Sequence, residues 1–274
     1  MWFSKPDPAK HGQKNVQIRE GVFPEEYAFR GCFHAVVSGG EFPGPYALHA
    51  AKSPRIQSGR FSGPFCLYAA EQAEIRGGVF TGSMAAYGVQ GASVEGGTFA
   101  GEYAFCESRD VAVAGGEFTG RGALSEARNA RVRGGRFAGE DCGITSQGLV
   151  LQGGVYTGPG LLRSSLRSVV LGVETAGAEA LAEAREVRVL TQGAIAHLGN
   201  VTSGIVAARR IGTLSPALTV SDDLLVLAEE TGTPDPRVRL LPAGTIPPQG
   251  DPRQAVAFLE SLRDAHRPRA AAQP

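Results

Sequence analysis

Side chains that can move protons or stack on ring compounds recur at intervals of 19 residues. His49, Tyr68 and Tyr87 follow one another at this interval, and Cys106 and Ser125 continue the series. Imidazole exchanges a proton near neutral pH, while tyrosine rings stack on organic molecules and their hydroxyl groups form hydrogen bonds. We therefore expect His49 to act as an acid or base and the other members to contact a ligand.

A pair of carboxylates has the same spacing. Glu107 and Glu126 each follow a member of the first series by one residue. If the interval places them ~4.8 Å apart, one carboxylate raises the pKa of the other, and the two can act as acid and base. The alternative is that each is separately solvated beside Arg109 or Arg128.

Three further residues are candidates for contact with a ligand. Arg30 begins the series that contains His49, while Met84 and Tyr103 belong to a preceding series of the same interval. Arg30 is equally compatible with an ordinary surface charge. The stacked tyrosines are equally compatible with packing between neighbouring repeats and no ligand at all.

The same interval governs most of the chain. An aliphatic residue precedes each repeated aromatic residue by five positions, and glycine stands two positions before and, from the second repeat on, two positions after it. Glycine at fixed positions supplies backbone conformations that other residues avoid. The aromatic series is Phe23, Phe42, Phe61, Phe80, Phe99, Phe118, Phe137 and Tyr156.

This repeat predicts a solenoid. A unit of 19 residues is too short for a helical hairpin, and it reads as short alternating stretches separated by glycine. Each unit would form one coil of short strands that buries its apolar side only against neighbouring coils. The predicted fold class is all-β, a right-handed parallel β-helix over residues 16–230, regular to about residue 187 and irregular beyond it.

The two ends of the chain differ from the repeats. Residues 231–250 are rich in proline and glycine and are predicted to be a connector. Residues 251–266 are predicted to be a capping helix, with Asp251 as its N-cap and Pro252 in its first turn. We expect this helix to cover the last coil, because open strand edges invite aggregation. Residues 1–15 and 267–274 are expected to be loose tails.

The segment after the second glycine of each repeat is predicted to be a strand, as in residues 84–87. Alternation would then send the series of Arg30 and His49 outward, together with a series of small residues. Small residues between aromatic walls would form the floor of a groove, which suits an organic ligand or a sugar ring. The small residues are Ala28, Ala47, Cys66, Ala85, Ala104, Ala123 and Cys142.

Composition excludes several classes of function. Lys and Arg number 27, and so do Asp and Glu, so the chain lacks the basic excess of most nucleic-acid binders. No apolar run is long enough for a membrane helix, and the start lacks the apolar stretch of a secretion signal. The four cysteines lack the C-x-x-C spacing of a zinc site. We therefore expect a cytoplasmic protein without a metal site or cofactor.

Two segments of the chain resemble a known family. One contains residues 103–105, 109–111, 115–118 and 123–130, and the other runs from residue 193 to 212. Over roughly residues 16–215 the chain resembles a bacterial family of uncharacterised function within the pectate-lyase-like β-helix superfamily. The resemblance implies the fold and no particular reaction.

Three functions follow as hypotheses. The first is a cofactor-independent isomerase, cyclase or lyase that positions a neutral, partly apolar small molecule in the groove, with His49 or Glu126 moving a proton. The second is a non-catalytic glycan-binding module that uses the same tyrosines. The third is a structural or self-assembling scaffold, for example a homodimer. A closed pocket would favour the first, an open strip the second, and a flat apolar face the third.

Overall fold

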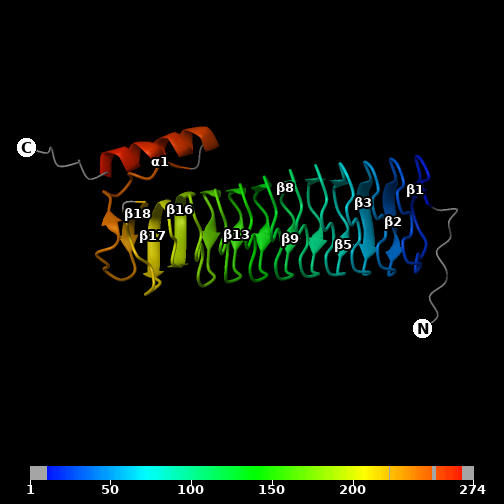
Figure 1. The fold of residues 1–274 in the computed structure, drawn as a ribbon, viewed down its shortest axis with the longest axis horizontal. Helices are drawn as coiled ribbons and strands as arrows, with labels where there is room; N and C mark the ends of the chain where they lie inside the picture. The colour runs from blue at the N-terminus through cyan, green and yellow to red at the C-terminus, as the bar shows by residue number, and fades with distance from the viewer. Residues whose placement is uncertain (1–10, 222, 249–250, 267–274) are drawn as a thin grey trace, which may run out of the picture.

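The computed structural model describes residues 11–221, 223–248 and 251–266. The predicted tails lie outside the described residues, apart from residues 11–15. The chain winds into coils that stack along one long axis, with the N-terminal coils at one end and a helix beside the other (Figure 1). Every strand pairing is parallel, and equivalent residues of successive regular coils are 19 apart. The predicted parallel β-solenoid is confirmed.

One ladder of strands runs along the whole solenoid. Its members are β1 (Gln17–Ile18), β2 (Val36–Phe42), β3 (Arg55–Phe61), β4 (Glu74–Ile75), β6 (Ser93–Val94), β8 (Ala112–Ala114), β10 (Arg131–Arg133), β12 (Val150–Gln152), β14 (Val169–Leu171), β16 (Val187–Leu198), β17 (Gly204–Leu214), β18 (Leu224–Thr231) and β19 (Arg239–Leu240).

A second ladder follows the first within each regular coil, and it continues the pairing of β2 with β3. Its members are β5 (Val79–Phe80), β7 (Thr98–Phe99), β9 (Glu117–Phe118), β11 (Arg136–Phe137), β13 (Val155–Tyr156) and β15 (Glu174–Thr175). A third contact between coils is a row of single parallel bridges, such as that between Arg109 and Arg128.

The core is a stack of phenylalanine rings. From Phe42 to Tyr156 the repeated aromatic residues are at most 1% exposed, and successive ring centroids are 4.5–4.8 Å apart. The aliphatic residue five positions earlier in each coil is buried beside them, as Ile56 and Val132 are. The 19-residue register therefore aligns identical side chains inside the solenoid, which is the packing that the sequence predicts.

The two glycine series have different structural roles. A Cβ added at Gly101 would lie 2.0 Å from the carbonyl oxygen of Gly82, so the backbones of neighbouring coils approach too closely for any side chain. Gly97 instead has a φ of 97°, a conformation that other residues rarely adopt. Both series are therefore required by the shape of the coil.

The segment after the second glycine is a run of turns, and the prediction of a strand there is wrong. Alternate residues have positive φ, such as 58° at Tyr46 and 57° at Leu48, and the His49 N–H donates to the Tyr46 carbonyl at 3.1 Å. Side chains therefore do not alternate with period two. Ala47 and Leu48 are both buried, at 1% and 0% exposure.

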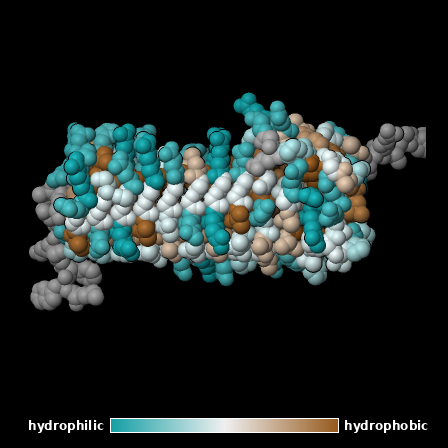
Figure 2. Space-filling view, turned by 180° about the vertical axis from the view of Figure 1, so that it is seen from behind, coloured by the Kyte–Doolittle hydropathy of each residue, from teal (hydrophilic) through white to brown (hydrophobic). Residues whose placement is uncertain are grey.

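The predicted groove floor is absent for this reason. All seven small residues that were expected to face outward are part of the core, and none is more than 4% exposed. Figure 2 shows another face of the solenoid, where bands of near-neutral residues run along the axis between hydrophilic side chains and hydrophobic residues occur as isolated spots.

The C-terminal coils are irregular in length, as predicted. The pairing of Val187 with Gly204 sets a coil of 17 residues, and the pairing of Gly204 with Leu224 sets one of 20. The register also shifts between Thr191 and Ala194. Longer strands accompany this change, since β16, β17 and β18 contain 12, 11 and 8 residues.

The helix α1 (Pro252–His266) lies along the side of the solenoid, roughly parallel to its axis, rather than across its end (Figure 1). Ala255, Leu259 and Leu262 of α1 form a second apolar core with outward residues of the strands, including Leu171 and Leu190. The prediction that the helix covers the last coil needs correction, because its apolar partners span several coils from β14 to β18. An ion pair between Arg188 and Glu260, at 2.8 Å, adds to the contact.

Candidate functional site

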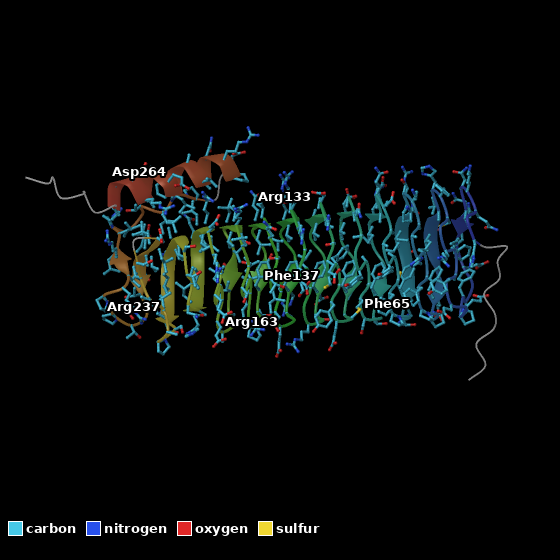
Figure 3. The ribbon with its side chains drawn as sticks, viewed as in Figure 1. Phe65, Arg133, Phe137, Arg163, Arg237 and Asp264 are labelled. Atoms are coloured by element: carbon cyan, nitrogen blue, oxygen red, sulfur yellow. The ribbon has the colours of Figure 1, made fainter. Side chains whose placement is uncertain are left out.

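Two columns of stacked rings line the outer surface of the N-terminal coils, and we call them together the aromatic ladder. Within each column the ring centroids are 4.8–5.4 Å apart and the planes are within 16° of parallel. The first column consists of Tyr27, Tyr46 and Phe65, and the second of His49, Tyr68 and Tyr87. Phe65 lies on the same long edge of the solenoid as Arg163, whereas Arg133 lies on the opposite edge, beside α1 (Figure 3).

The two columns also contact each other. The rings of Tyr46 and Tyr68 meet edge to face at a centroid distance of 6.0 Å, and those of Phe65 and Tyr68 at 5.9 Å. Stacking covers both faces of a ring inside a column, so Tyr46 and Tyr68 present edges to solvent. A ladder of this kind stabilises itself through offset and edge-to-face contacts.

Tyr87 ends the second column, as Phe65 ends the first. One face stacks on Tyr68, and the next two residues of the register, Cys106 and Ser125, carry no ring. Among the described residues, no ring stacks on the second face of Tyr87. The ladder therefore ends at Tyr87, with one ring face that no other ring covers.

Cys106 and Ser125 do not face solvent as predicted. They are 6% and 2% exposed, respectively. A Cβ added at Gly122 would lie 2.5 Å from the ring of Tyr103 and 3.1 Å from Oγ of Ser125, so the ring lies across Gly122 beside the serine. The prediction fails because it assumed an extended strand and took no account of a ring from the preceding coil.

Two buried polar atoms near the ladder have no hydrogen-bond partner in the structure, namely Oγ of Ser125 and Nδ1 of His49. Buried polar side chains are normally hydrogen-bonded, to protein or to water. Neither atom is accessible from the surface, so neither is placed to contact a bound molecule. The ring of His49 is itself half-buried between Tyr27, Tyr46 and Tyr68.

The charge state of His49 depends on its surroundings. Burial lowers the pKa of its imidazole below the usual 6.5, and the positive charge of Arg30 lowers it further. Arg30 is exposed, and its guanidinium lies 5.1 Å from the ring centroid of Tyr27. The folded protein therefore holds His49 neutral at neutral pH, which is the form that accepts a proton.

Glu107 joins the ladder to a neighbouring depression. The hydroxyl group of Tyr87 donates a hydrogen bond to Oε1 of Glu107, and this bond raises the pKa of Tyr87 well above its usual value. The depression has a volume of about 530 Å³. It is lined by Glu107, Arg109, Glu126, Arg128, Thr145 and Gln147. The structure thus brings the predicted carboxylates together in one open depression, with two arginines beside them.

Asp141 forms an ion cluster that the sequence analysis missed. It is 6% exposed and binds Arg121 at 2.9 Å and Arg163 at 2.6 Å. A Cβ added at Gly160 would lie 2.5 Å from Oδ1 of Asp141, so this glycine leaves room for the carboxylate. The sequence contains a signal for this cluster. Asp141 stands in the register of Tyr103, where earlier coils have aromatic residues, and the positions one coil before and after it are glycine.

Met84 and Tyr103 continue the first column of the ladder and are both half-buried. Met84 occupies the register between Phe65 and Tyr103. Neither has a stacked aromatic partner among the described residues. Of the predicted contact residues, the structure therefore gathers Met84, Tyr87 and Tyr103 around the end of the ladder, whereas Arg30 lies at its other end.

The four cysteines are free and buried. Burial raises the pKa of Cys106 to about 11 and that of Cys142 to about 12. Within the ranges that the structure describes, no three His, Cys, Asp or Glu side chains are grouped in a way that could hold a metal ion. Over the same ranges, no helix is long and apolar enough to cross a membrane.

Fold and site together define a parallel β-solenoid with an outer aromatic ladder. No known protein family matches the chain, and no curated protein or solved structure is significantly similar to it.

Proposed function

We propose that the protein is a glycan-binding module that holds a neutral saccharide at the C-terminal end of the aromatic ladder. The observation that carries the proposal is the Tyr87 ring, one face of which no other ring covers. Sugar rings stack on aromatic faces, and within each column of the ladder the inner rings offer only edges. The binding position is therefore set by the end of a column.

The depression beside Tyr87 supports the proposal. Its carboxylates, Glu107 and Glu126, accept hydrogen bonds from sugar hydroxyl groups, and Thr145 and Gln147 donate or accept them. Arg109 and Arg128 balance the two carboxylates, so the lining carries no net formal charge. This balance favours a neutral sugar over a polyuronate. The depression is open, which suits the binding of a saccharide chain that extends along the solenoid.

The proposal extends to the class and location of the protein. We place the chain in the pectate-lyase-like superfamily of right-handed β-helices, on the strength of its parallel 19-residue coils. We place it in the cytoplasm, and the four unpaired cysteines support this because disulfides are rare in reducing compartments.

Binding is tested by calorimetric titration with neutral glucan hexasaccharides of β-1,3 and β-1,4 linkage and with a galacturonan of equal length. We expect one neutral glucan to bind and Tyr87→Ala to weaken its binding at least about tenfold, or about 1.4 kcal/mol. The matched control is Tyr46→Ala, which removes a ring whose faces are already covered by Tyr27 and Phe65. An equal loss of affinity for the glucan in the two variants would contradict the proposal. Tighter binding of the galacturonan than of the neutral glucans would also contradict it.

A second candidate is the cofactor-independent isomerase, cyclase or lyase. The observation in its favour is His49, whose lowered pKa suits a general base. The distinguishing measurement is proton NMR of a bound glucan over a day. A new product that His49→Gln abolishes would establish the enzyme, whereas an unchanged spectrum leaves a binding module.

The structure offers less to the scaffold hypothesis. Large apolar side chains that are exposed among the described residues stand singly, as Val22, Val155 and Leu240 do. Scattered exposed apolar residues are normal for a protein surface, and an interface between copies needs a contiguous patch.

A further inference from the structure

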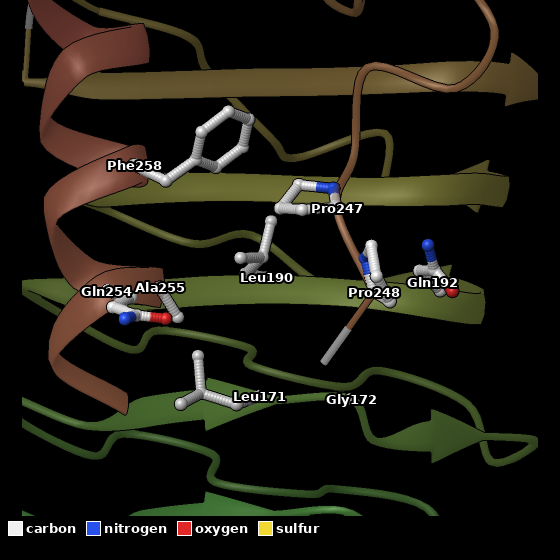
Figure 4. A pocket seen from close by; sticks show the side chains of 9 residues that line it. All are labelled: Leu171, Gly172, Leu190, Gln192, Pro247, Pro248, Gln254, Ala255 and Phe258. Carbon is white, nitrogen blue, oxygen red and sulfur yellow. The ribbon is translucent and has the colours of Figure 1, made fainter. Parts of the chain in front are cut away.

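The strongest feature outside the ladder is a pocket between α1 and the solenoid (Figure 4). Leu171, Gly172 and Leu190 form its floor on the outer face of β14 and β16, and Ala255 and Phe258 of α1 form one wall. Pro247 and Pro248 of the connector form the opposite wall. None of these residues belongs to the aromatic ladder or to the depression beside it.

We propose that this pocket binds a neutral, flat aromatic molecule of one or two rings that carries a single hydroxyl group. The volume of the pocket, about 250 Å³, sets the size of the ligand. An engineered apolar cavity of about 150 Å³ binds benzene, so a pocket of this volume accepts a bicyclic ring. The same volume is below the usual range of about 300–1,000 Å³ for drug-sized ligands, which favours a small ligand.

The chemistry of the lining sets the character of the ligand. Among the described residues no charged side chain lines the pocket, and the two consecutive prolines contribute no N–H donors to its wall. Apolar side chains around an unfilled space lack contacts that a ligand would supply. A charged molecule would lose its hydration there without a compensating partner. The pocket therefore selects a neutral, mainly apolar molecule.

Gln192 is the reason for expecting a hydroxyl group on the ligand. Its Nε2 donates to the carbonyl of Ile246 at 3.1 Å, which holds the amide beside the prolines. Gln192 and Gln254 both line the pocket, and Oε1 of Gln192 is not used by this bond. A ligand hydroxyl group that donates to Oε1 would fix the orientation of the ring.

The probe for the test is 1-naphthol, with naphthalene for comparison. We expect 1-naphthol to bind the full-length protein with a blue-shifted emission, and to show intermolecular NOEs to the methyl groups of Leu171 and Leu190 and the ring of Phe258. Ala255→Phe fills the pocket and should weaken binding at least tenfold. Ala257→Phe makes the same change on an exposed position of α1 and should leave affinity unchanged.

A second pair of measurements tests the role of Gln192. Gln192→Leu should reduce the affinity for 1-naphthol about tenfold and leave that for naphthalene within twofold. Equal effects on the two probes would overturn the assignment of the hydroxyl group. Absence of NOEs to the pocket, or equal binding by the Ala255 and Ala257 variants, would overturn the site. Tyr87→Ala should not alter naphthol binding, which separates this site from the proposed glycan site.

Discussion

Tyr87 and Glu107, twenty residues apart in sequence, share a hydrogen bond between neighbouring coils, in which the phenolic hydroxyl donates to the carboxylate. The bond ties the last ring of the second column to the rim of the depression. It also keeps the phenol protonated, because an ionised Tyr87 would lose the bond and be repelled by Glu107. The orientation of the ring face that no other ring covers therefore depends on a carboxylate of the next coil.

Removing this carboxylate should change the titration of Tyr87. In Glu107→Gln we expect the pKa of Tyr87 to fall towards the usual 10.0, because the amide is uncharged and accepts a weaker hydrogen bond. Ultraviolet titration of phenolate formation, with Tyr87→Phe to identify the signal, measures the change. Glu126→Gln is the matched control, since this glutamate does not contact Tyr87. A curve for Glu107→Gln identical to that of the wild type would contradict the bond.

The lowered pKa of His49 should make stability depend on pH. The unfolded chain takes up a proton at His49 as the pH falls through about 6.5, while the folded protein resists it until a lower pH. Proton uptake therefore favours the unfolded state, and the free energy of unfolding should decrease as the pH falls below about 6.5.

Urea unfolding at pH 7.5 and 5.5 measures this effect. His49→Gln should lose less stability between the two pH values than the wild type does. Arg30→Gln should raise the pKa of His49, since it removes a nearby positive charge. If the wild type and His49→Gln lose the same free energy, His49 is not buried as described.

Gly101, from the series that follows the aromatic residues, and Gly115, which belongs to neither series, predict different costs of substitution. Gly101→Ala should destabilise the fold by at least about 3 kcal/mol, because the new methyl group would meet the backbone of the preceding coil 2.0 Å away. Gly115→Ala introduces no contact within 4 Å but strains a φ of 80°, and should cost about 1–2 kcal/mol. Thermal and urea unfolding measure both values, and the reverse order would refute the close approach of the coils.

The cysteines should react slowly in the folded protein. Burial raises the pKa of Cys32 and Cys106 to about 11 and that of Cys142 to about 12, which suppresses the reactive thiolate. With a thiol reagent at pH 8 we expect rates at least about a hundredfold below those of a free cysteine. Four thiols should react after unfolding without reductant. Fewer than four would reveal a disulfide, and fast reaction of the native protein would show that a thiol is exposed.

Much of the fold follows from the register of the sequence. Equivalent residues 19 apart lie on one another, so the stacks of Phe80 on Phe99 and of Tyr68 on Tyr87 follow from the interval alone. The interval also predicts which side chains are neighbours, including Glu107 and Glu126 in their shared depression.

The register does not predict which way a side chain points. Ala47 and Leu48 are consecutive and both buried because alternate residues of the turn run have positive φ, which no strand pattern anticipates. Non-glycine residues rarely adopt that conformation, so their types give no local signal for it. The groove was predicted from strand alternation and is absent for this reason.

The position of α1 could have been predicted from the same register. The outward series that contains polar Arg133 and Gln152 continues with apolar Leu171 and Leu190. This change occurs where the helix packs, because those leucines join its buried face. A change from polar to apolar residues in an outward series thus indicates that another element covers that side of the solenoid. The composition of the helix alone did not show which side of the solenoid it would cover.

The most direct test of the account is the contact between a bound saccharide and the unstacked face of Tyr87. With the glucan that binds in calorimetry, intermolecular NOEs measure which aromatic protons lie next to the sugar ring. The account predicts NOEs from sugar C–H protons to the ring of Tyr87, and none to the ring of Tyr46, whose faces are covered. NOEs to Tyr46 and none to Tyr87, or sugar contacts confined to another face of the solenoid, would contradict it.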